Sequence, residues 1–521
     1  MELFTKPSAV ETFYEAVLFR LKKLFLYIED WANRCFSPRF NPFYYLGAIS
    51  TLFFIILLIS GIYLFIFYRT NHPYQIVQDL TEKQWYLGGI IRSIHRYASD
   101  GLIISLLLHT LREYVNGRYS HYRWLAWVSG IILFIISFIL GISGYWLVWD
   151  QRAQLIALKT SELLNDVPLF IEPPSRSFLS NESLSGMLFF LLHFLHSALP
   201  FAMLILIGIH TMRCSRPILK TPNVITMVVI VMMLMVSIIK PATSAEPADL
   251  TRFPINIPFD WFFFFIYPVK SNLPKPAFWL MTTGVTLTLF IMPWIKRHRP
   301  PAAQVVLEKC TGCDQCNKDC PYGAIRLQPR TDRLAYKMEA VIIPERCAAC
   351  GICVGACDFN AVNLPGMTDL QIKEEITNLL SGIQLMDRKP KILLLICEQS
   401  IRFNAKVDII KRMINVKVIS LPCIGMIQPE MIEIGFNAGA DGIFVSGCVM
   451  GDCHYRKGNI WLQARLRDKR PPLLDKRIDR HRIRECRLSP INTIKLVEEI
   501  LLFEEELSVY NLDGHKRPHI T

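Results

Sequence analysis

Long apolar stretches constrain this chain more than any other feature of its sequence. Residues 46–68 are uncharged and mostly apolar, and about 20 such residues suffice for a helix that crosses a bilayer. Similar stretches lie at about 88–111, 125–149, 184–211, 223–239 and 276–295. With 52% hydrophobic and only 19% charged residues, a wholly soluble or disordered chain is excluded. The first half of the chain is therefore expected to be an all-α transmembrane bundle of about six helices.

The composition predicts six segments. They are an amphipathic N-terminal segment (1–43), a four-helix part (44–222), two further membrane helices with their loop (223–299), a polar cysteine-rich part (300–366), a linker helix (367–390) and a C-terminal part (391–521). In the last part short apolar runs alternate with helical patterns, which predicts an α/β domain with an open parallel sheet. The N-terminal segment lacks the short apolar core of a signal peptide.

Loop charges predict the orientation of these helices. The loops 112–123 and 212–222 and the tail 296–300 carry nine Lys/Arg in 28 residues, whereas the other loops carry nine in 89. Basic loops stay in the cytoplasm, so the N-terminus and everything after residue 296 are expected there, at a prokaryotic inner membrane. Twelve of the 15 cysteines lie between Cys310 and Cys453 in that later part, and a reducing compartment suits metal ligation better than disulfides.

Four histidines in two of the expected membrane helices share one spacing. His95 and His109 lie in the second stretch, His196 and His210 lie in the fourth, and each pair is 14 residues apart. In a helix 14 residues are nearly four turns, so both histidines share one face, roughly 21 Å apart along the axis. Two such helices facing each other make two bis-histidine sites at two depths. Such a site suits a haem iron that carries electrons and has no open position.

Glycines in the neighbouring stretches repeat the same interval. They are Gly47 and Gly61 in the first stretch, and Gly130 and Gly144 in the third. A flat macrocycle between helices needs residues without a Cβ at its own depth. The pattern favours haem over histidines that only hydrogen-bond a neighbouring helix. His193, one turn before His196, falls outside the interval and is expected to pack or to form a hydrogen bond.

The histidine motifs resemble the cytochrome b of bc-type quinol oxidoreductases. The resemblance is carried by GGIIRSIHRYAS around His95, by LHSALPF around His196 and by GYWLVWDQ at the end of the third stretch. It implies that 44–222 is a haem-binding four-helix bundle. His95 and His196 would hold one haem b near the outer face, and His109 and His210 would hold a second near the cytoplasm.

Four further residues take expectations from this resemblance, and a fifth, Asp100, takes one from its position inside a membrane helix. Arg92 and Arg96 are implied to neutralise haem propionates, with snorkelling to the interface as the alternative. The family's outer quinol site has Pro-Glu-Trp-Tyr where this chain has Phe-Asp-Trp-Phe, so Asp260 is the quinone-site candidate. Tyr45 stands where some relatives attach an extra haem through a cysteine, so no covalent haem is expected. Asp100 is either functional or a buried hydrogen-bonding residue.

Two cysteine motifs predict a two-cluster ferredoxin domain of the α+β class. Residues 310–321 have the pattern Cys-x2-Cys-x2-Cys-x3-Cys-Pro, and 347–357 repeat it without the proline. In the bacterial ferredoxin motif the fourth cysteine ligates the other cluster. The expected 4Fe-4S ligand sets are Cys310, Cys313, Cys316 and Cys357 for one cluster, and Cys347, Cys350, Cys353 and Cys320 for the other. A zinc site would need a different spacing.

Four more cysteines follow the apolar runs of the C-terminal part. Cys397 ends KILLLIC, Cys423 ends VKVISLPC, Cys448 ends DGIFVSGC, and Cys453 follows five residues later. If the runs are parallel strands, the cysteines gather at the carboxyl edge of the sheet, where such folds build their sites. Buried structural cysteines are the alternative.

This part resembles the delta subunit of methyl-viologen-reducing hydrogenase. The resemblance is carried by SLPC, AGADGIFVSGC and GDCHYRKGN. It implies a 2Fe-2S cluster and docking to a flavin-bearing subunit like heterodisulfide reductase. Cys35, Cys214 and Cys486 are given no role. The basic run from Arg465 to Arg487 lacks a nucleic-acid-binding motif, and we expect a solvated face or a docking patch for an acidic partner.

Together these features predict an electron-transfer subunit in a membrane. The chain would link a cytoplasmic iron–sulfur, flavin or hydrogenase-type partner to quinone, as a homodimer within a larger complex. One alternative is a bc-like quinol oxidase with a Rieske or cytochrome c partner, and another is a non-catalytic redox anchor. Neither GxGxxG nor a P-loop is present, so the chain itself is not expected to bind NAD.

The histidine pattern makes a spectroscopic prediction. The purified chain should carry two b-type haems with a bis-histidine spectrum, and acidified solvent should extract both because no thioether bond holds them. Pyridine haemochrome quantitation per polypeptide measures this. A single haem, or haem that stays with the polypeptide after extraction, would contradict the assignment.

Overall fold

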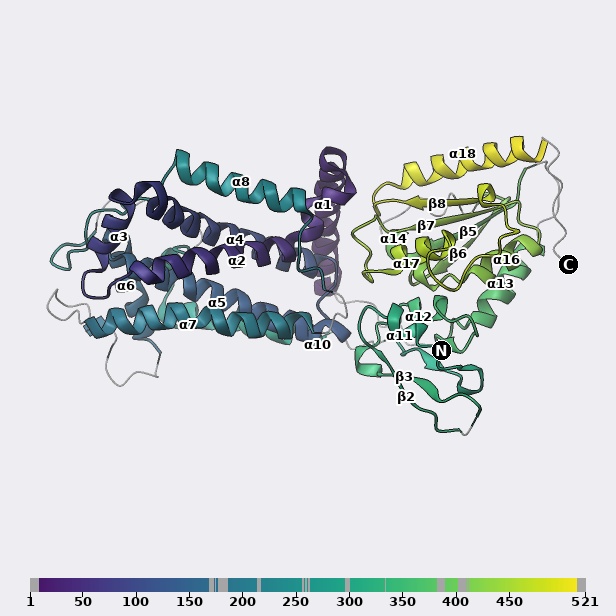
Figure 1. The fold of residues 1–521 in the computed structure, drawn as a ribbon, viewed down its shortest axis with the longest axis horizontal. Helices are drawn as coiled ribbons and strands as arrows, with labels where there is room; N and C mark the ends of the chain where they lie inside the picture. Colours follow the sequence, from purple (N-terminus) through teal and green to yellow (C-terminus); the bar gives the residue numbers. More distant parts are fainter. Residues whose placement is uncertain are drawn as a thin grey trace. The chain divides into compact units, whose positions relative to one another are not determined.

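The computed structural model describes residues 9–167, 173, 175–176, 186–212, 217–254, 257, 260, 263–295, 300–332, 334–381, 389–401, 410 and 412–512. These residues form two compact units. One is helical and comprises Tyr45–Met212 and Pro217–Lys296, and the other contains the N-terminal helix and the chain after residue 296. Figure 1 shows the helices of the first unit and the sheet of the second.

All six apolar stretches are helices. They are α2 (Leu46–Phe67), α4 (Ile90–Val115), α5 (Trp124–Val148), α7 (Gly186–Thr211), α8 (Asn223–Ile239) and α10 (Lys275–Ile295). Shorter helices α3 (Pro73–Glu82), α6 (Gln151–Leu164) and α9 (Ile266–Asn272) lie in the connections. Among the described helices four are long and apolar enough to cross a membrane, and these contain α2, α5, α7 and α10. α8 has only 17 residues, and α4 carries charged side chains.

The helices of the first unit pack in pairs. α2 lies along α4 and α5 lies along α7. A buried cluster joins the pairs through Phe53 of α2, Leu102 of α4, Leu133 of α5 and Met203 of α7. The close approach of α2 to α4 depends on Gly101, because a Cβ there would lie 2.6 Å from the Phe53 ring. This packing brings the histidine helices α4 and α7 into one core with the glycine helices α2 and α5.

The second unit begins with helix α1 (Ala9–Phe40) and continues with a cysteine-rich part. That part has two antiparallel pairs: β1 (Gln304–Val305) with β4 (Val362–Asn363), and β2 (Ile325–Pro329) with β3 (Met338–Ile342). The short helices α11 (Gln315–Asp319) and α12 (Ile352–Gly355) carry cysteines of the two motifs. The expected linker helix is α13 (Asp369–Ser381).

The C-terminal part is the expected parallel α/β sheet. Its strands are β5 (Ile392–Cys397), β6 (Val416–Leu421), β7 (Gly442–Gly447) and β8 (Ile483–Arg487), in the order β6-β5-β7-β8 with all neighbours parallel. Helix α18 (Thr493–Leu512) packs on Ile392, Leu394 and Ile396. Helix α16 (Pro429–Asn437) approaches Leu393 at Gly435. Both faces are covered, which explains the continuous apolar runs.

Candidate redox-cofactor sites

The structure places the four expected haem ligands as two facing pairs. The ring centres of His95 and His196 are 6.4 Å apart, and those of His109 and His210 are also 6.4 Å apart. A metal–imidazole bond is about 2 Å long. Two such bonds, plus the distance from each nitrogen to its ring centre, account for a separation of this size. Both pairs therefore fit a metal held between two imidazoles.

Each of the four glycines lies against one of these imidazoles. A Cβ on Gly61 would lie 3.3 Å from His95, on Gly144 3.2 Å from His196, on Gly47 3.3 Å from His109 and on Gly130 3.1 Å from His210. These distances are tighter than a carbon–carbon contact of about 3.5–4.0 Å. The missing Cβ atoms therefore make room for the ligand rings themselves, which the spacing alone does not reveal.

Three serines orient the histidines. Nδ1 of His95 is 2.9 Å from the Ser60 hydroxyl, Nδ1 of His196 is 2.9 Å from Ser143, and Nδ1 of His210 is 3.2 Å from Ser129. Each serine hydroxyl donates to a carbonyl of its own helix. The imidazole Nδ1–H is then the donor, which leaves Nε2 for a metal. The signal for this role is local, because each serine directly precedes one of the four glycines.

His193 is not a member of the neighbouring His95–His196 pair. Its ring centre is 4.8 Å from those of Phe65 and Tyr68. The side chain therefore packs among aromatic rings of the α2 end, in line with the role expected for it.

The two arginines expected at haem propionates have protein partners. Arg92 donates to Thr81 and, at 2.9 Å, to the Ser244 hydroxyl. Arg96 pairs with Asp100 on its own helix and with Asp260 at 2.6 Å. A propionate role for Arg96 would have to be shared with these carboxylates. The ion pair with Arg96 accounts for the presence of the Asp100 carboxylate within α4.

Asp260 is the centre of a small polar cluster. Its carboxylate accepts hydrogen bonds from Tyr145 and from Arg96, and its side chain is 9% exposed. It also accepts from the backbone N–H of Phe263 at 3.2 Å. Its sequence neighbours Phe259, Trp261 and Phe262 lie outside the described residues. The arrangement fixes the carboxylate and compensates its charge, which no local pattern in the sequence indicates.

The cysteines of the two motifs form two groups. Burial, together with the nearby thiols of Cys357, Cys313 and Cys310, raises the pKa of the Cys316 thiol to about 12. Burial also raises the pKa of Cys353, and the thiols that add to the shift are those of Cys350, Cys320 and Cys347, followed by Cys316. These are the neighbours expected for the two ligand sets. Each thiol must lose its proton to bind iron.

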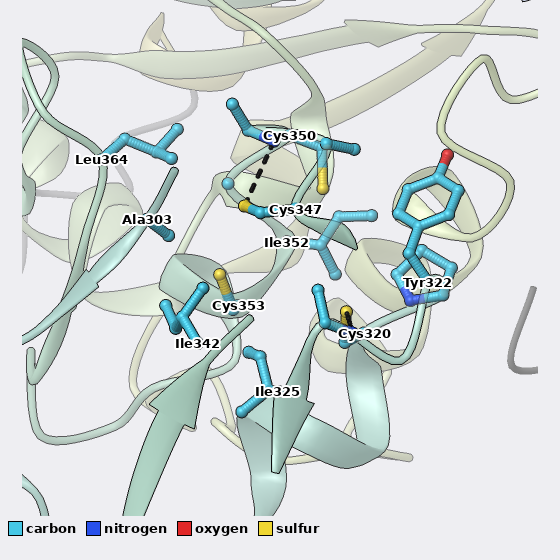
Figure 2. A pocket seen from close by; sticks show the side chains of 15 residues that line it. Ala303, Cys320, Tyr322, Ile325, Ile342, Cys347, Cys350, Ile352, Cys353 and Leu364 are labelled. Carbon is cyan, nitrogen blue, oxygen red and sulfur yellow. Dashed lines mark hydrogen bonds between the residues drawn. The ribbon is translucent and has the colours of Figure 1, made fainter. Parts of the chain in front are cut away.

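One cysteine group lines a cavity. Figure 2 shows the sulfur atoms of Cys320, Cys347, Cys350 and Cys353 around it, with apolar walls that include Ile325 and Ile342. The Ala324 N–H donates to the Cys320 sulfur and the Ala349 N–H donates to the Cys347 sulfur, each at 3.4 Å. Backbone donors aimed at sulfur in an apolar pocket are typical of a cluster site.

Both motifs fold their loops in the same way. The third residue of each motif has a positive φ, 69° at Gly312 and 51° at Ala349. The fifth residue does too, with 70° at Asp314 and 74° at Gly351. These left-handed residues turn the backbone so that successive cysteines face the same side. Non-glycine residues adopt this conformation at a cost of about 1–2 kcal/mol, which is typical of functional sites.

The last four cysteines meet at the carboxyl edge of the parallel sheet. Cys397 ends β5, Cys448 follows β7, and their sulfur atoms are 3.9 Å apart. This is the point where the strand order reverses, between β5 and its two neighbours. Hydrogen bonds with the Cys423 and Cys448 thiols lower the pKa of both Cys397 and Cys453. The four sulfurs therefore form a ring of alternating neighbours.

Three cysteines remain outside these groups. Cys35 is exposed on α1 and Cys486 is buried in β8, while Cys214 lies outside the described residues.

The basic run beginning at Arg465 is not a uniform solvated face. Arg465 is fully buried in an ion pair with Asp319, which the sequence analysis missed.

Comparisons with known proteins agree with the three resemblances. Residues 32–216 match Cytochrome b/b6/petB, residues 309–361 match the 4Fe-4S dicluster domain, and residues 392–509 match the delta subunit of methyl-viologen-reducing hydrogenase. The chain thus carries a cytochrome b/b6 domain, a 4Fe-4S dicluster domain and a hydrogenase delta-subunit-like domain in succession. The loop that contains Asp260 lies beyond the cytochrome b match.

The curated relatives of the first domain are cytochrome b6 proteins. That of Prochlorothrix hollandica is 30% identical over 146 residues, which are 27% of this chain and 64% of the relative. That of Mastigocladus laminosus is 34% identical over 125 residues, 24% of this chain and 58% of the relative. The chain therefore spans less than two thirds of these relatives. A solved chain of a hyperthermophilic respiratory Complex III aligns at 18% identity with a TM-score of 0.39, over 49% of this chain and 75% of that one.

The glycine–imidazole contacts predict a selective loss of haem. Gly61→Val should displace His95 and reduce haem content by about half, because the His109–His210 pair is untouched. Gly208→Val on α7 is the matched control, since nothing lies within 4 Å of a Cβ there. Haem per polypeptide measures both. Equal haem content in the two variants would contradict the role of the glycine.

Proposed function

We propose that the chain is a membrane-bound electron-transfer subunit that links a cytoplasmic redox partner to the quinone pool. The observation that carries the proposal is the pair of facing histidine couples, with ring centres 6.4 Å apart, in a chain that also groups twelve cysteines into three sets of four. A chain that holds both kinds of site can serve as a conductor between a soluble partner and the membrane. The comparisons support this class of protein, since they match a cytochrome b family, a 4Fe-4S dicluster domain and a hydrogenase subunit family.

His95 with His196, and His109 with His210, would hold two haem b groups, which supply one-electron transfer when bound. Two imidazoles per iron leave no position for oxygen or substrate. Serine oxygens at Nδ1 keep Nε2 directed at the metal. Gly47, Gly61, Gly130 and Gly144 keep the rings in place.

The cysteine groups would hold three iron–sulfur clusters. Cys310, Cys313, Cys316 and Cys357 would hold one 4Fe-4S cluster, Cys347, Cys350, Cys353 and Cys320 the second, and Cys397, Cys423, Cys448 and Cys453 a 2Fe-2S cluster. The charges of the basic loops support a cytoplasmic position for these groups. The delta-subunit match supports a flavin-bearing or hydrogenase-type partner there.

Asp260 is the candidate proton acceptor at an outer quinone site. Quinol oxidation releases protons, and a positioned carboxylate can accept one from the quinol hydroxyl. Tyr145 and Arg96 hold the carboxylate in place. The Asp260 cluster also supports the second candidate function, a bc-like quinol oxidase that works with a Rieske partner. A non-catalytic anchor would need no such carboxylate.

Replacement of Asp260 tests the outer site. If it accepts the proton, Asp260→Asn should lower quinol-linked turnover about 10²-fold or more with unchanged haem content, and Asp260→Glu should retain most of it. Asp79→Asn is the control, because Asp79 is an exposed carboxylate paired with Lys83. Unchanged turnover in Asp260→Asn would move the chemistry to the inner haem.

Iron content tests the C-terminal cluster. The intact chain should bind about ten non-haem irons, eight in the ferredoxin part and two in the C-terminal part. Cys397→Ser should lower this by about two, whereas Cys486→Ser, at another buried cysteine of the same sheet, should leave it unchanged. Zinc instead of iron, or equal loss in both variants, would rule out the cluster.

A further inference from the structure

The ferredoxin part and the parallel-sheet part share a tightly packed boundary within one compact unit. Helix α12 meets the short turn η7 (Ile424–Met426) that follows β6. A Cβ on Gly355 would lie 2.2 Å from the Gly425 carbonyl oxygen, and a Cβ on Gly425 would lie 2.9 Å from the Ile352 side chain. Gln428 adds two buried hydrogen bonds, to the carbonyls of Val354 at 2.9 Å and Cys357 at 2.8 Å. The backbone of the ferredoxin part lies directly against the backbone of the sheet part here, so the two parts are fixed in one orientation.

Cysteines from two different groups pack together at this boundary. Cys350, Cys423 and Cys453 belong to one buried cluster with Ile352 between the two parts. Cys350 also lines the cavity of Figure 2. Of the cysteines in the ferredoxin motifs, it is the one in this cluster among the described residues. The Cys320–Cys347–Cys350–Cys353 group therefore adjoins the four-cysteine site of the sheet, whereas Cys313 of the other group is exposed.

A buried ion pair spans the same boundary. Asp319, the residue before Cys320, receives a 2.7 Å hydrogen bond from Arg465 on α17 (Gly458–Leu466), and neither side chain is exposed. Arg465 also donates to the Gly425 carbonyl at 2.9 Å. Arg470 approaches the other carboxylate oxygen at 2.7 Å and stacks on Trp461, which donates to the Asp319 carbonyl at 3.1 Å.

Such a pair is an inefficient way to stabilise a fold. The desolvation of two charges offsets most of their attraction, and an apolar replacement is often as stable. What the pair adds is a directional link between the loop of Cys320 and helix α17. That helix begins at Gly458, where a Cβ would lie 2.1 Å from the Cys423 sulfur. The link thus connects a residue beside one cysteine group with a helix beside the other.

We infer that Asp319 and Arg465 are positioning residues that hold the Cys320–Cys347–Cys350–Cys353 group against the Cys397–Cys423–Cys448–Cys453 group, so that electrons pass directly between these two sites. The exchange moves one electron: the group that gives it is oxidised by one and the group that receives it is reduced by one, with no proton or bond change. The Cys310–Cys313–Cys316–Cys357 group is then one step further from the sheet. This inference rests on the proposed function, because it requires iron–sulfur clusters at both groups.

Magnetic coupling in the full-length protein tests the inference. Two reduced clusters that are direct neighbours enhance each other's spin relaxation. In stepwise dithionite reduction followed by electron paramagnetic resonance, the 2Fe-2S signal should relax faster once the adjacent cluster is reduced. Arg465→Gln should keep its iron but lose much of that enhancement. The surface pair variant Asp475→Asn/Arg477→Gln, from an exposed ion pair of the same domain, should behave as wild type.

Each outcome is decisive. Wild-type protein with full iron and no enhancement overturns direct adjacency, and Arg465→Gln with full iron and full enhancement overturns the positioning role. If Arg465→Gln alone misfolds because Asp319 is left buried and charged, Asp319→Asn/Arg465→Gln removes both charges. Loss of enhancement in that variant supports the inference, and full enhancement refutes it. Wild-type protein that binds no iron at the cysteines refutes the proposed function itself, which separates the two failures.

Discussion

Close packing against glycine is the constraint on which both units of this protein depend. In the helical unit α2 lies against α4, and α5 against α7, at depths where Gly61 and Gly144 leave room for His95 and His196. A side chain there would push the rings off the line on which two imidazoles can share one iron. In the second unit Gly355 and Gly425 let the ferredoxin part meet the sheet. The geometry of the candidate cofactor sites therefore depends on the missing Cβ atoms of these glycines as much as on the ligand residues.

Ion pairs between distant segments are the second recurring element. Arg96 with Asp260 in the helical unit, and Arg465 with Asp319 in the other, join segments far apart in the sequence. Each pair has a further charged neighbour, since Arg96 also pairs with Asp100 and Asp319 also pairs with Arg470. Pairs of this kind specify geometry more than stability. Both lie next to a candidate redox site: Arg96 directly follows His95, and Asp319 directly precedes Cys320.

Features that depend on a fixed residue spacing could be predicted from the sequence. Side-chain contacts between residues far apart in the sequence could not. The 14-residue intervals of His95–His109 and Gly47–Gly61 follow from helix geometry, and the cysteine motifs encode their own loops. The parallel sheet followed from apolar runs that end in cysteine. The partner of Asp260, the burial of Arg465 and the packing of Cys350 in one cluster with Cys423 depend on residues that only tertiary packing brings together. The serine at each imidazole had a local signal, Ser60 before Gly61, which acquires meaning once the ring is placed.

The proposed function requires the haem-binding and cysteine-bearing parts of one chain to form a single conductor. Anaerobic stopped-flow mixing of the chain in lipid nanodiscs with a reduced, protein-sized low-potential donor tests this most directly, with haem absorbance as the readout. We expect rapid haem reduction in the wild type and much slower reduction in Cys350→Ser, which alters the group beside the sheet but leaves the histidines intact. Haem reduction at the same rate in both proteins would contradict it, because electrons would then reach the haems without the iron–sulfur sites.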